Sequence, residues 1–166
     1  MIIRSISLED AEPYLAMLKQ LDRETDMMMY EPEERSGTFC EMTRLIQDAE
    51  SAGSLILVVE DENRLVGFLS AERGFANRIR HSAYIVVGIL ASHRGKGLGK
   101  RLFQELDHWA AKNQIGKLEL TVLAHNQAGI RLYTSMGFKI EGTKKKSLFI
   151  NGQYYDELYM GKIMNP

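Results

Sequence analysis

The chain has 166 residues, of which 45% are hydrophobic and 26% are charged, and its formal net charge is -1. This length and composition suit one globular domain with a real core, and the near-zero charge argues against a general nucleic-acid binder. Cys40 is the only cysteine, so an internal disulfide is excluded. With no long apolar run and no cleavable leader pattern, we expect one cytoplasmic domain over residues 1–166 that does not cross a membrane.

Hydrophobic periodicity and turn residues predict alternating strands and helices. In chain order, we expect a strand at 2–6, a helix starting after Ser7, a helix from 39 to 52, strands at 54–60, 64–72 and 84–90, a helix at 100–112, a strand at 117–123, a helix at 126–136, and strands at 138–150 and 154–164. In the second helix, Phe39 and Leu45 are expected to face inward with Met42, Ile46 and Ala49. The alternation indicates an α/β domain with a central mixed sheet.

A basic, glycine-rich turn joins the strand at 84–90 to the helix at 100–112. Its sequence is Arg94-Gly95-Lys96-Gly97-Leu98-Gly99. Glycines let the backbone turn sharply with uncovered amides, and the following helix start adds unpaired N–H groups and a partial positive charge. The turn therefore predicts a cradle for a diphosphate. Its spacing is neither that of the dinucleotide fingerprint nor that of the P-loop, and an ordinary tight turn is the alternative.

A second polar pair lies downstream of this turn. Asn126 begins a predicted helix, and Tyr133 follows seven residues later, so both face the same way about 10 Å apart along the axis. Taken singly, Asn126 is explained as a helix cap and Tyr133 as a core aromatic residue. Together they are a candidate cofactor contact and a candidate proton donor.

The two motifs resemble those of the GNAT superfamily of N-acetyltransferases. The family's cofactor motif, Arg/Gln-x-x-Gly-x-Gly/Ala, matches residues 94–99, and its second motif matches Asn126, Tyr133, Gly137 and Phe138. The resemblance implies a central mixed, mostly antiparallel sheet with splayed parallel strands in the middle, flanked by about four helices. It also implies acetyl-CoA as co-substrate and transfer of its acetyl group to a primary amine of a small molecule or peptide.

The resemblance further implies where acetyl-CoA lies. Its pyrophosphate is expected beside Arg94, on the backbone amides of Gly95, Lys96, Gly97, Leu98, Gly99 and Lys100. Its pantetheine arm is expected along Val87, Gly88 and Ile89 and against Asn126. The thioester carbonyl would meet a backbone N–H close to Gly88 or Ile89, and Tyr133 would lie near the sulfur.

The implied chemistry is direct attack of a neutral amine on the thioester, with Tyr133 as general acid for the leaving thiolate. The base stays open. Relatives carry glutamates at the positions held here by Thr121 and Tyr84, so Glu119, Glu72 and a water relay are the candidates. For both glutamates, a solvated strand-end charge is the alternative. A covalent route through Cys40 is not expected, because the sequence places no histidine to activate it.

Residues 24–34 combine five acidic side chains with three methionines, which predicts an apolar slot with an acidic rim for a cationic amine. A solvated loop is the alternative. Three histidines lack metal-ligand spacing, so no metal is expected. The tyrosine-rich final strands offer an edge for a homodimer. Two other functions stay open: a sensor or scaffold that binds acetyl-CoA without turnover, and, more distantly, a nucleotide-dependent oxidoreductase.

Overall fold

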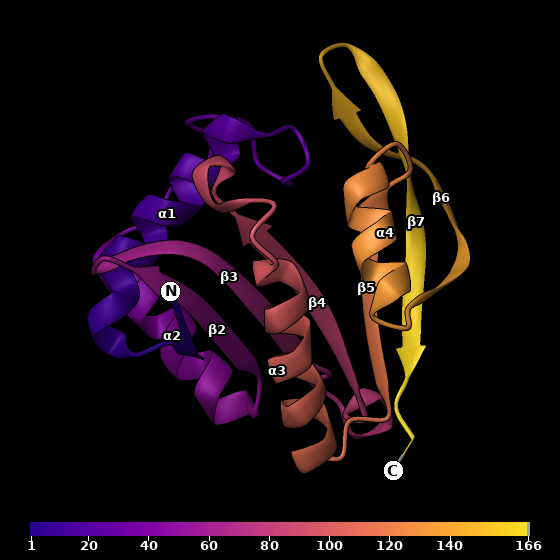
Figure 1. Ribbon diagram of the computed structural model, residues 1–166, viewed down its shortest axis with the longest axis horizontal. Helices are drawn as coiled ribbons and strands as arrows, with labels where there is room; N and C mark the ends of the chain where they lie inside the picture. Colours follow the sequence, from indigo (N-terminus) through magenta and orange to yellow (C-terminus); the bar gives the residue numbers. More distant parts are fainter. Residues whose placement is uncertain (166) are drawn as a thin grey trace.

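The central sheet sets the position of every other element in this protein (Figure 1). The computed structural model describes residues 1–165, and within them seven strands form one sheet in the order β1-β2-β3-β4-β5-β7-β6, accompanied by four α-helices. The strands are β1 Ile2–Ser5, β2 Leu55–Asp61, β3 Arg64–Arg73, β4 Ser82–Ile89, β5 Lys117–Leu123, β6 Lys139–Ile150 and β7 Gln153–Ile163. The helices are α1 Ala11–Glu24, α2 Phe39–Ala52, α3 Leu98–Lys112 and α4 Gln127–Ser135. The expected fold class is confirmed.

The sheet divides in its middle. All neighbouring strands are antiparallel except β4 and β5, which run parallel. Those two strands pair only where residues 82–84 meet residues 117–119, and over the rest of the described range they do not pair. They diverge toward the ends that lead into the glycine turn and into α4 (Figure 1). We call this opening the β4–β5 split.

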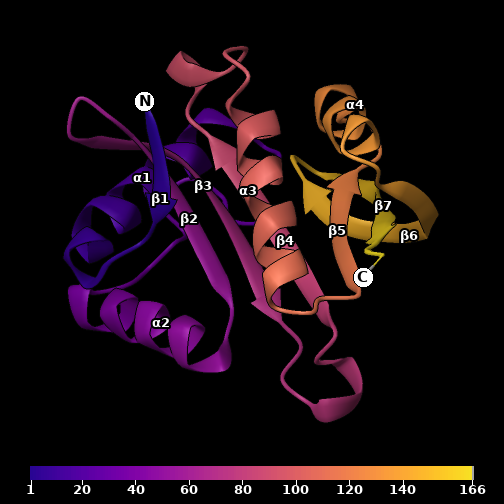
Figure 2. The ribbon, with the colours of Figure 1, turned by 60° about the horizontal axis from the view of Figure 1, so that its bottom comes forward.

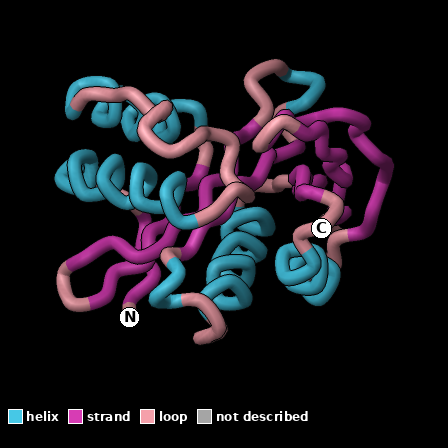
Figure 3. Tube along the Cα trace, turned by 90° about the horizontal axis from the view of Figure 1, so that it is seen from above, coloured by secondary structure: helices cyan, strands magenta, loops and turns pink. Residues whose placement is uncertain are grey.

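Helices pack on both faces of the sheet (Figure 3). On one face, α1 and α2 form a core with β2 and β3 around Leu21, Ile46 and Phe68. On the other, α3 supplies Leu102, Phe103 and Leu106 to the larger core, and α4 packs its apolar side chains against it. Figure 2 shows α3 and α4 on either side of the β4–β5 split. Within residues 1–165, no helix is long and apolar enough to cross a membrane.

Local signals explain where the helices begin. The Thr38 hydroxyl accepts the Glu41 N–H at 3.2 Å, the Glu41 carboxylate accepts the Thr38 N–H at 2.7 Å, and Gly53 ends α2 with a positive φ of 71°. A 3-10 turn at Leu8–Asp10 leads into α1.

Two expectations about the helices were wrong. Phe39 and Leu45 do not face the core, because they are 57% and 45% exposed, and Met42 and Ile46 fill that contact instead. The helix after the glycine turn starts at Leu98, two residues earlier than expected, and buries that leucine in the core.

Candidate functional site

One large cavity of about 1460 Å³ follows the β4–β5 split and reaches under α1 and α2. Among the residues singled out from the sequence, its lining includes Glu72, Val87, Gly88, Ile89, Arg94, Gly95, Gly97, Leu98, Gly99, Lys100, Asn126 and Tyr133. Lys96 and Glu119 do not line it. The fold thus brings the glycine turn, the β4 edge and the Asn126–Tyr133 pair to one cavity.

The glycine turn owes its shape to backbone conformation. Gly95 and Gly97 have positive φ values of 73° and 76°, and a Cβ at either position would meet no atom within 4 Å. Glycine is therefore needed there for its φ, not for space. Gly99 differs, since a Cβ would lie 2.8 Å from Leu132 Cδ2, so its role is close packing of α3 on α4. The first-turn N–H groups of α3, beginning at Leu98, remain free for an anion.

Side chains from distant elements hold the segment that enters this turn. The Glu24 carboxylate, at the end of α1, accepts the Ala91 N–H at 2.7 Å, and His93 Nε2 lies 3.1 Å from Asp61 Oδ2. Partial burial would raise the pKa of Glu24, but the hydrogen bond from Ala91, together with other polar contacts, keeps it below its usual range. Arg94 Nε donates to the Ile89 carbonyl at 2.9 Å, so part of that guanidinium group is used within the protein.

The backbone of β4 has an open edge beside the split. Leu90 donates its N–H to Val66 O at 2.9 Å, and the register between β3 and β4 is unbroken. Because alternate residues of an antiparallel strand bond to the same neighbour, Gly88 also bonds to β3, whereas Val87 and Ile89 direct their backbone groups toward β5. In the described chain, β5 does not pair with them. An extended ligand can pair with this edge.

Asn126 and Tyr133 both line the cavity from α4. Asn126 Oδ1 accepts the Gly129 N–H at 3.0 Å, so this side chain does cap the helix, and its amide nitrogen has no partner within residues 1–165. Tyr133 packs its ring 5.6 Å from that of Phe103, and its hydroxyl makes no hydrogen bond to any described residue. Burial, with Tyr84 nearby, raises the pKa of Tyr133 to about 12. The phenol is therefore protonated and free to donate.

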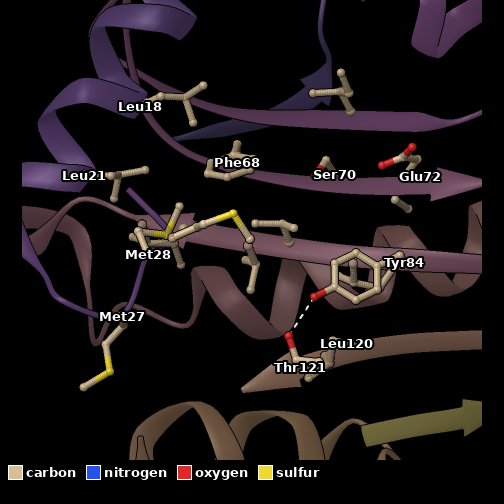
Figure 4. A pocket seen from close by; sticks show the side chains of 18 of the residues that line it. Leu18, Leu21, Met27, Met28, Phe68, Ser70, Glu72, Tyr84, Leu120 and Thr121 are labelled. Carbon is tan, nitrogen blue, oxygen red and sulfur yellow. Dashed lines mark hydrogen bonds between the residues drawn. The ribbon is translucent and has the colours of Figure 1, made fainter. Parts of the chain in front are cut away.

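Polar side chains form the floor of the cavity where the strands part (Figure 4). The Tyr84 and Thr121 hydroxyls are 2.7 Å apart and join β4 to β5 across the start of the split. Glu72 is the register partner of Tyr84 and lines the cavity beside it. Glu119 instead lies 3.7 Å from Lys117 Nζ. Sequence reasoning missed the Tyr84–Thr121 contact, although Tyr84 and Thr121 had already been noted at positions where relatives carry glutamate.

For the segment between α1 and α2, the expected apolar lining is present but the expected acidic rim is not. Met27, Met28 and Met29 line the cavity, but of the acidic residues in the segment none does. Glu33, for example, pairs with Arg23 at 2.6 Å on the surface. The acidic rim was therefore wrong, because the acidic side chains of this segment lie outside the cavity, where Glu24 and Glu34 accept backbone N–H groups. In the described part of the chain, no group of three His, Cys, Asp or Glu side chains is arranged to hold a metal ion.

Two sequence relatives with an assigned activity match most of the chain. L-amino acid N-acetyltransferase AaaT of Escherichia coli is 30% identical over 119 residues, which cover 69% of this chain and 72% of the relative. Spermidine N(1)-acetyltransferase of Escherichia coli is 28% identical over 160 residues, covering 95% of this chain and 83% of the relative.

Solved structures share the whole architecture. A GNAT-family acetyltransferase from Streptococcus pneumoniae superposes with a TM-score of 0.94 at 28% identity over 99% of both chains. A GNAT-superfamily phosphinothricin acetyltransferase from Sinorhizobium meliloti, in complex with acetyl-CoA, gives 0.86 at 21% identity over 99% of this chain and 88% of that one, a likeness of fold. The sequence profile of the acetyltransferase (GNAT) family matches residues 16–138. This chain therefore belongs to the acetyltransferase (GNAT) family.

Proposed function

We propose that the protein is an acetyl-CoA-dependent N-acetyltransferase that moves the acetyl group to a primary amine within a ternary complex. The observation that carries this proposal is the β4–β5 split, in which an anion cradle, an open strand edge and a free phenol line one cavity. Family membership and the amine-acetylating relatives support the same reaction class. A structure of this fold in complex with acetyl-CoA supports that donor.

In this proposal the cavity binds the donor in an extended form. The diphosphate rests on the amides of residues 95–100, where the helix start favours negative charge. The pantetheine amides pair with the outward backbone groups of Ile89, which lies next to the glycine turn. The thioester lies at the end of the pantetheine arm farther from the diphosphate, so the outward N–H of Val87 serves its oxygen better than that of Ile89, while Gly88 directs its own N–H toward β3. The amide nitrogen of Asn126 is free to meet the same arm.

Starting from the ammonium form of the acceptor, the proposed transfer removes two protons from the nitrogen and supplies one to the sulfur. Glu72 takes a proton from the ammonium group of the acceptor, directly or through water, and the neutral nitrogen attacks the thioester carbon. The carbon–sulfur bond then breaks, and the Tyr133 hydroxyl protonates the departing thiolate. The second proton of the nitrogen leaves as the amide forms and returns through water to the Tyr133 oxygen. A phenol whose pKa is raised to about 12 keeps its proton near neutral pH. Glu72 is preferred over Glu119 because it lines the cavity and Glu119 does not.

The test measures thiol release with a panel of primary amines, and acetyl-CoA binding by calorimetry. Tyr133→Phe is expected to lower kcat by about 10² to 10⁴ while acetyl-CoA still binds, because only proton delivery is lost. Glu72→Gln is expected to lower kcat with a changed pH profile, whereas the matched Glu119→Gln change leaves kcat intact. Binding of acetyl-CoA without thiol release from any amine would instead support the sensor or scaffold function.

A further inference from the structure

Two cationic side chains of the cavity remain unexplained by donor binding. Of the five arginines that line it, Arg35 is held by Asp22, Arg73 by two backbone carbonyls and Arg94 by Ile89 O. Arg44 on α2 and Arg80 between β3 and β4 have no side-chain hydrogen bond or ion pair to any residue from 1 to 165. Unpaired guanidinium groups in a cavity are suited to bind a carboxylate.

Arg80 lies at the end of the cavity opposite the glycine turn. Its backbone carbonyl accepts Arg73 Nε at 2.8 Å, and Arg73 directly follows Glu72 at the end of β3. The glycine turn follows the other end of β4. A free carboxylate and a free guanidinium group therefore belong to the same acceptor end, at a distance from the diphosphate amides. That combination fits a ligand with both an ammonium and a carboxylate group.

Exposed apolar side chains also line the cavity. Phe75, in the connection that carries Arg80, is 91% exposed, and Leu45 on α2 and Val86 on β4 are 45% and 38% exposed. Figure 4 shows Leu18, Leu21 and Met28 grouped at the apolar part of the cavity and Glu72 at the polar part. Apolar groups that gather in one cavity without a partner mark a ligand contact.

The charge balance of the lining argues against polyamines. Its basic side chains are Arg35, Arg44, Arg73, Arg80, Arg94 and Lys100, and its carboxylates are Glu41, Asp48, Glu72 and Glu157. Glu41 already accepts the Thr38 N–H, and Glu157 accepts the Ser147 hydroxyl. An acceptor with two or three ammonium groups would find few free carboxylates and an excess of positive charge.

We propose that the acceptor is an α-amino acid with an apolar side chain, its ammonium group at Glu72, its carboxylate at Arg44 or Arg80, and its side chain against Phe75 and Leu45. This inference rests on the proposed acetyl transfer and names its substrate class. Glu72 removes one ammonium proton, the nitrogen attacks the thioester carbon, and the carbon–sulfur bond breaks to release the coenzyme thiol as the nitrogen loses its second proton through water. The carboxylate stays bound to the guanidinium group and unreacted.

The test compares kcat/KM for L-leucine, L-leucinamide, 3-methylbutylamine and spermidine with the full-length protein. L-Leucine is expected to be best, with about a ten- to hundredfold loss when its carboxylate is removed or converted to an amide. Equal values for L-leucine and 3-methylbutylamine, or a preference for spermidine, would overturn the proposal. If acetyl-CoA binds but no amine reacts, the proposed function itself fails.

Variants locate the carboxylate site. Arg44→Gln and Arg80→Gln are made singly, and at least one should raise KM for L-leucine about tenfold without changing the rate with 3-methylbutylamine. Arg78→Gln is the matched control, because Arg78 lies in the same connection as Arg80 but does not line the cavity. Phe75→Ala should reduce the preference for L-leucine over glycine. If both arginine variants behave like the control, the assignment is wrong.

Discussion

The Asp22–Arg35 ion pair offers a direct test of how burial sets the strength of a charge contact. Asp22 is on α1, and Arg35 belongs to the segment that carries the cavity methionines. Two hydrogen bonds of 2.6 and 3.0 Å join them, and the side chains are 1% and 17% exposed. Arg35 also lies 4.5 Å from the centroid of the Tyr30 ring. Replacing Arg35 by methionine would leave a buried carboxylate without its counter-ion.

The expected loss follows from that burial. Removing one partner of a buried pair costs about 3 to 5 kcal/mol. With an unfolding entropy of about 2.1 cal/mol/K per residue, the 166-residue chain changes its Tm by roughly 9 to 14 °C for this loss. Differential scanning calorimetry of Arg35→Met at neutral pH measures it. The double variant Asp22→Leu/Arg35→Met should recover much of the stability, since no buried charge then remains.

The matched control has the same geometry without the burial. Arg23 and Glu33 also share two hydrogen bonds, of 2.6 and 3.0 Å, but their side chains are 48% and 69% exposed. Arg23→Met should therefore lower Tm far less than Arg35→Met, because water screens the pair and solvates the remaining carboxylate. Equal losses in the two variants would show that burial does not decide the strength of these contacts.

Three further predictions concern packing, acid stability and the cofactor turn. Gly88→Ala would place a Cβ 2.9 Å from two buried side chains and should destabilise the fold by about 1 to 3 kcal/mol in urea; unchanged stability would refute the close packing. The Arg4 hydrogen bond lowers the pKa of Asp10 to about 2, so this pair stabilises the fold by about 1 to 2 kcal/mol above pH 4 and loses that contribution as the pH falls toward 2. The stability gap between wild type and Arg4→Met should narrow over that interval, and a constant gap would contradict the assignment. Glu24→Ala should weaken acetyl-CoA binding in calorimetry, Glu24→Gln should weaken it less because its amide oxygen still accepts the same N–H, and identical affinities for both variants would argue against this anchor.

Local patterns were enough to predict the order of the elements and the two motifs. The glycine turn was visible because its composition differs from its surroundings, and the Thr38–Glu41 capping pair marked the start of α2. Helical periodicity failed for Leu45, since it cannot distinguish a side chain facing the core from one facing a cavity. Alternation along β5 puts Lys117, Glu119 and Thr121 on one side of the strand, but it could not show that Thr121 would line the cavity and Glu119 would not.

Long-range contacts were outside the reach of such patterns. The Tyr84–Thr121 and Glu24–Ala91 contacts join residues 37 and 67 positions apart, and nothing local in the sequence marks the partners. The homodimer expected from the final strands stays a prediction. Two residues of those strands, Tyr154 and Tyr159, are 61% and 44% exposed, so a contact with a second copy is sterically open.

The glycine turn has a kinetic consequence, given the donor proposed for it. Acyl transfer leaves the diphosphate of the coenzyme chemically unchanged. The amides of residues 95–100 should therefore bind free coenzyme A about as tightly as acetyl-CoA. A contact that binds the ground state and the transition state equally tightly does not speed the chemical step. Free coenzyme A should accordingly compete with acetyl-CoA for the site, and the rate of turnover should depend on the concentration ratio of the two.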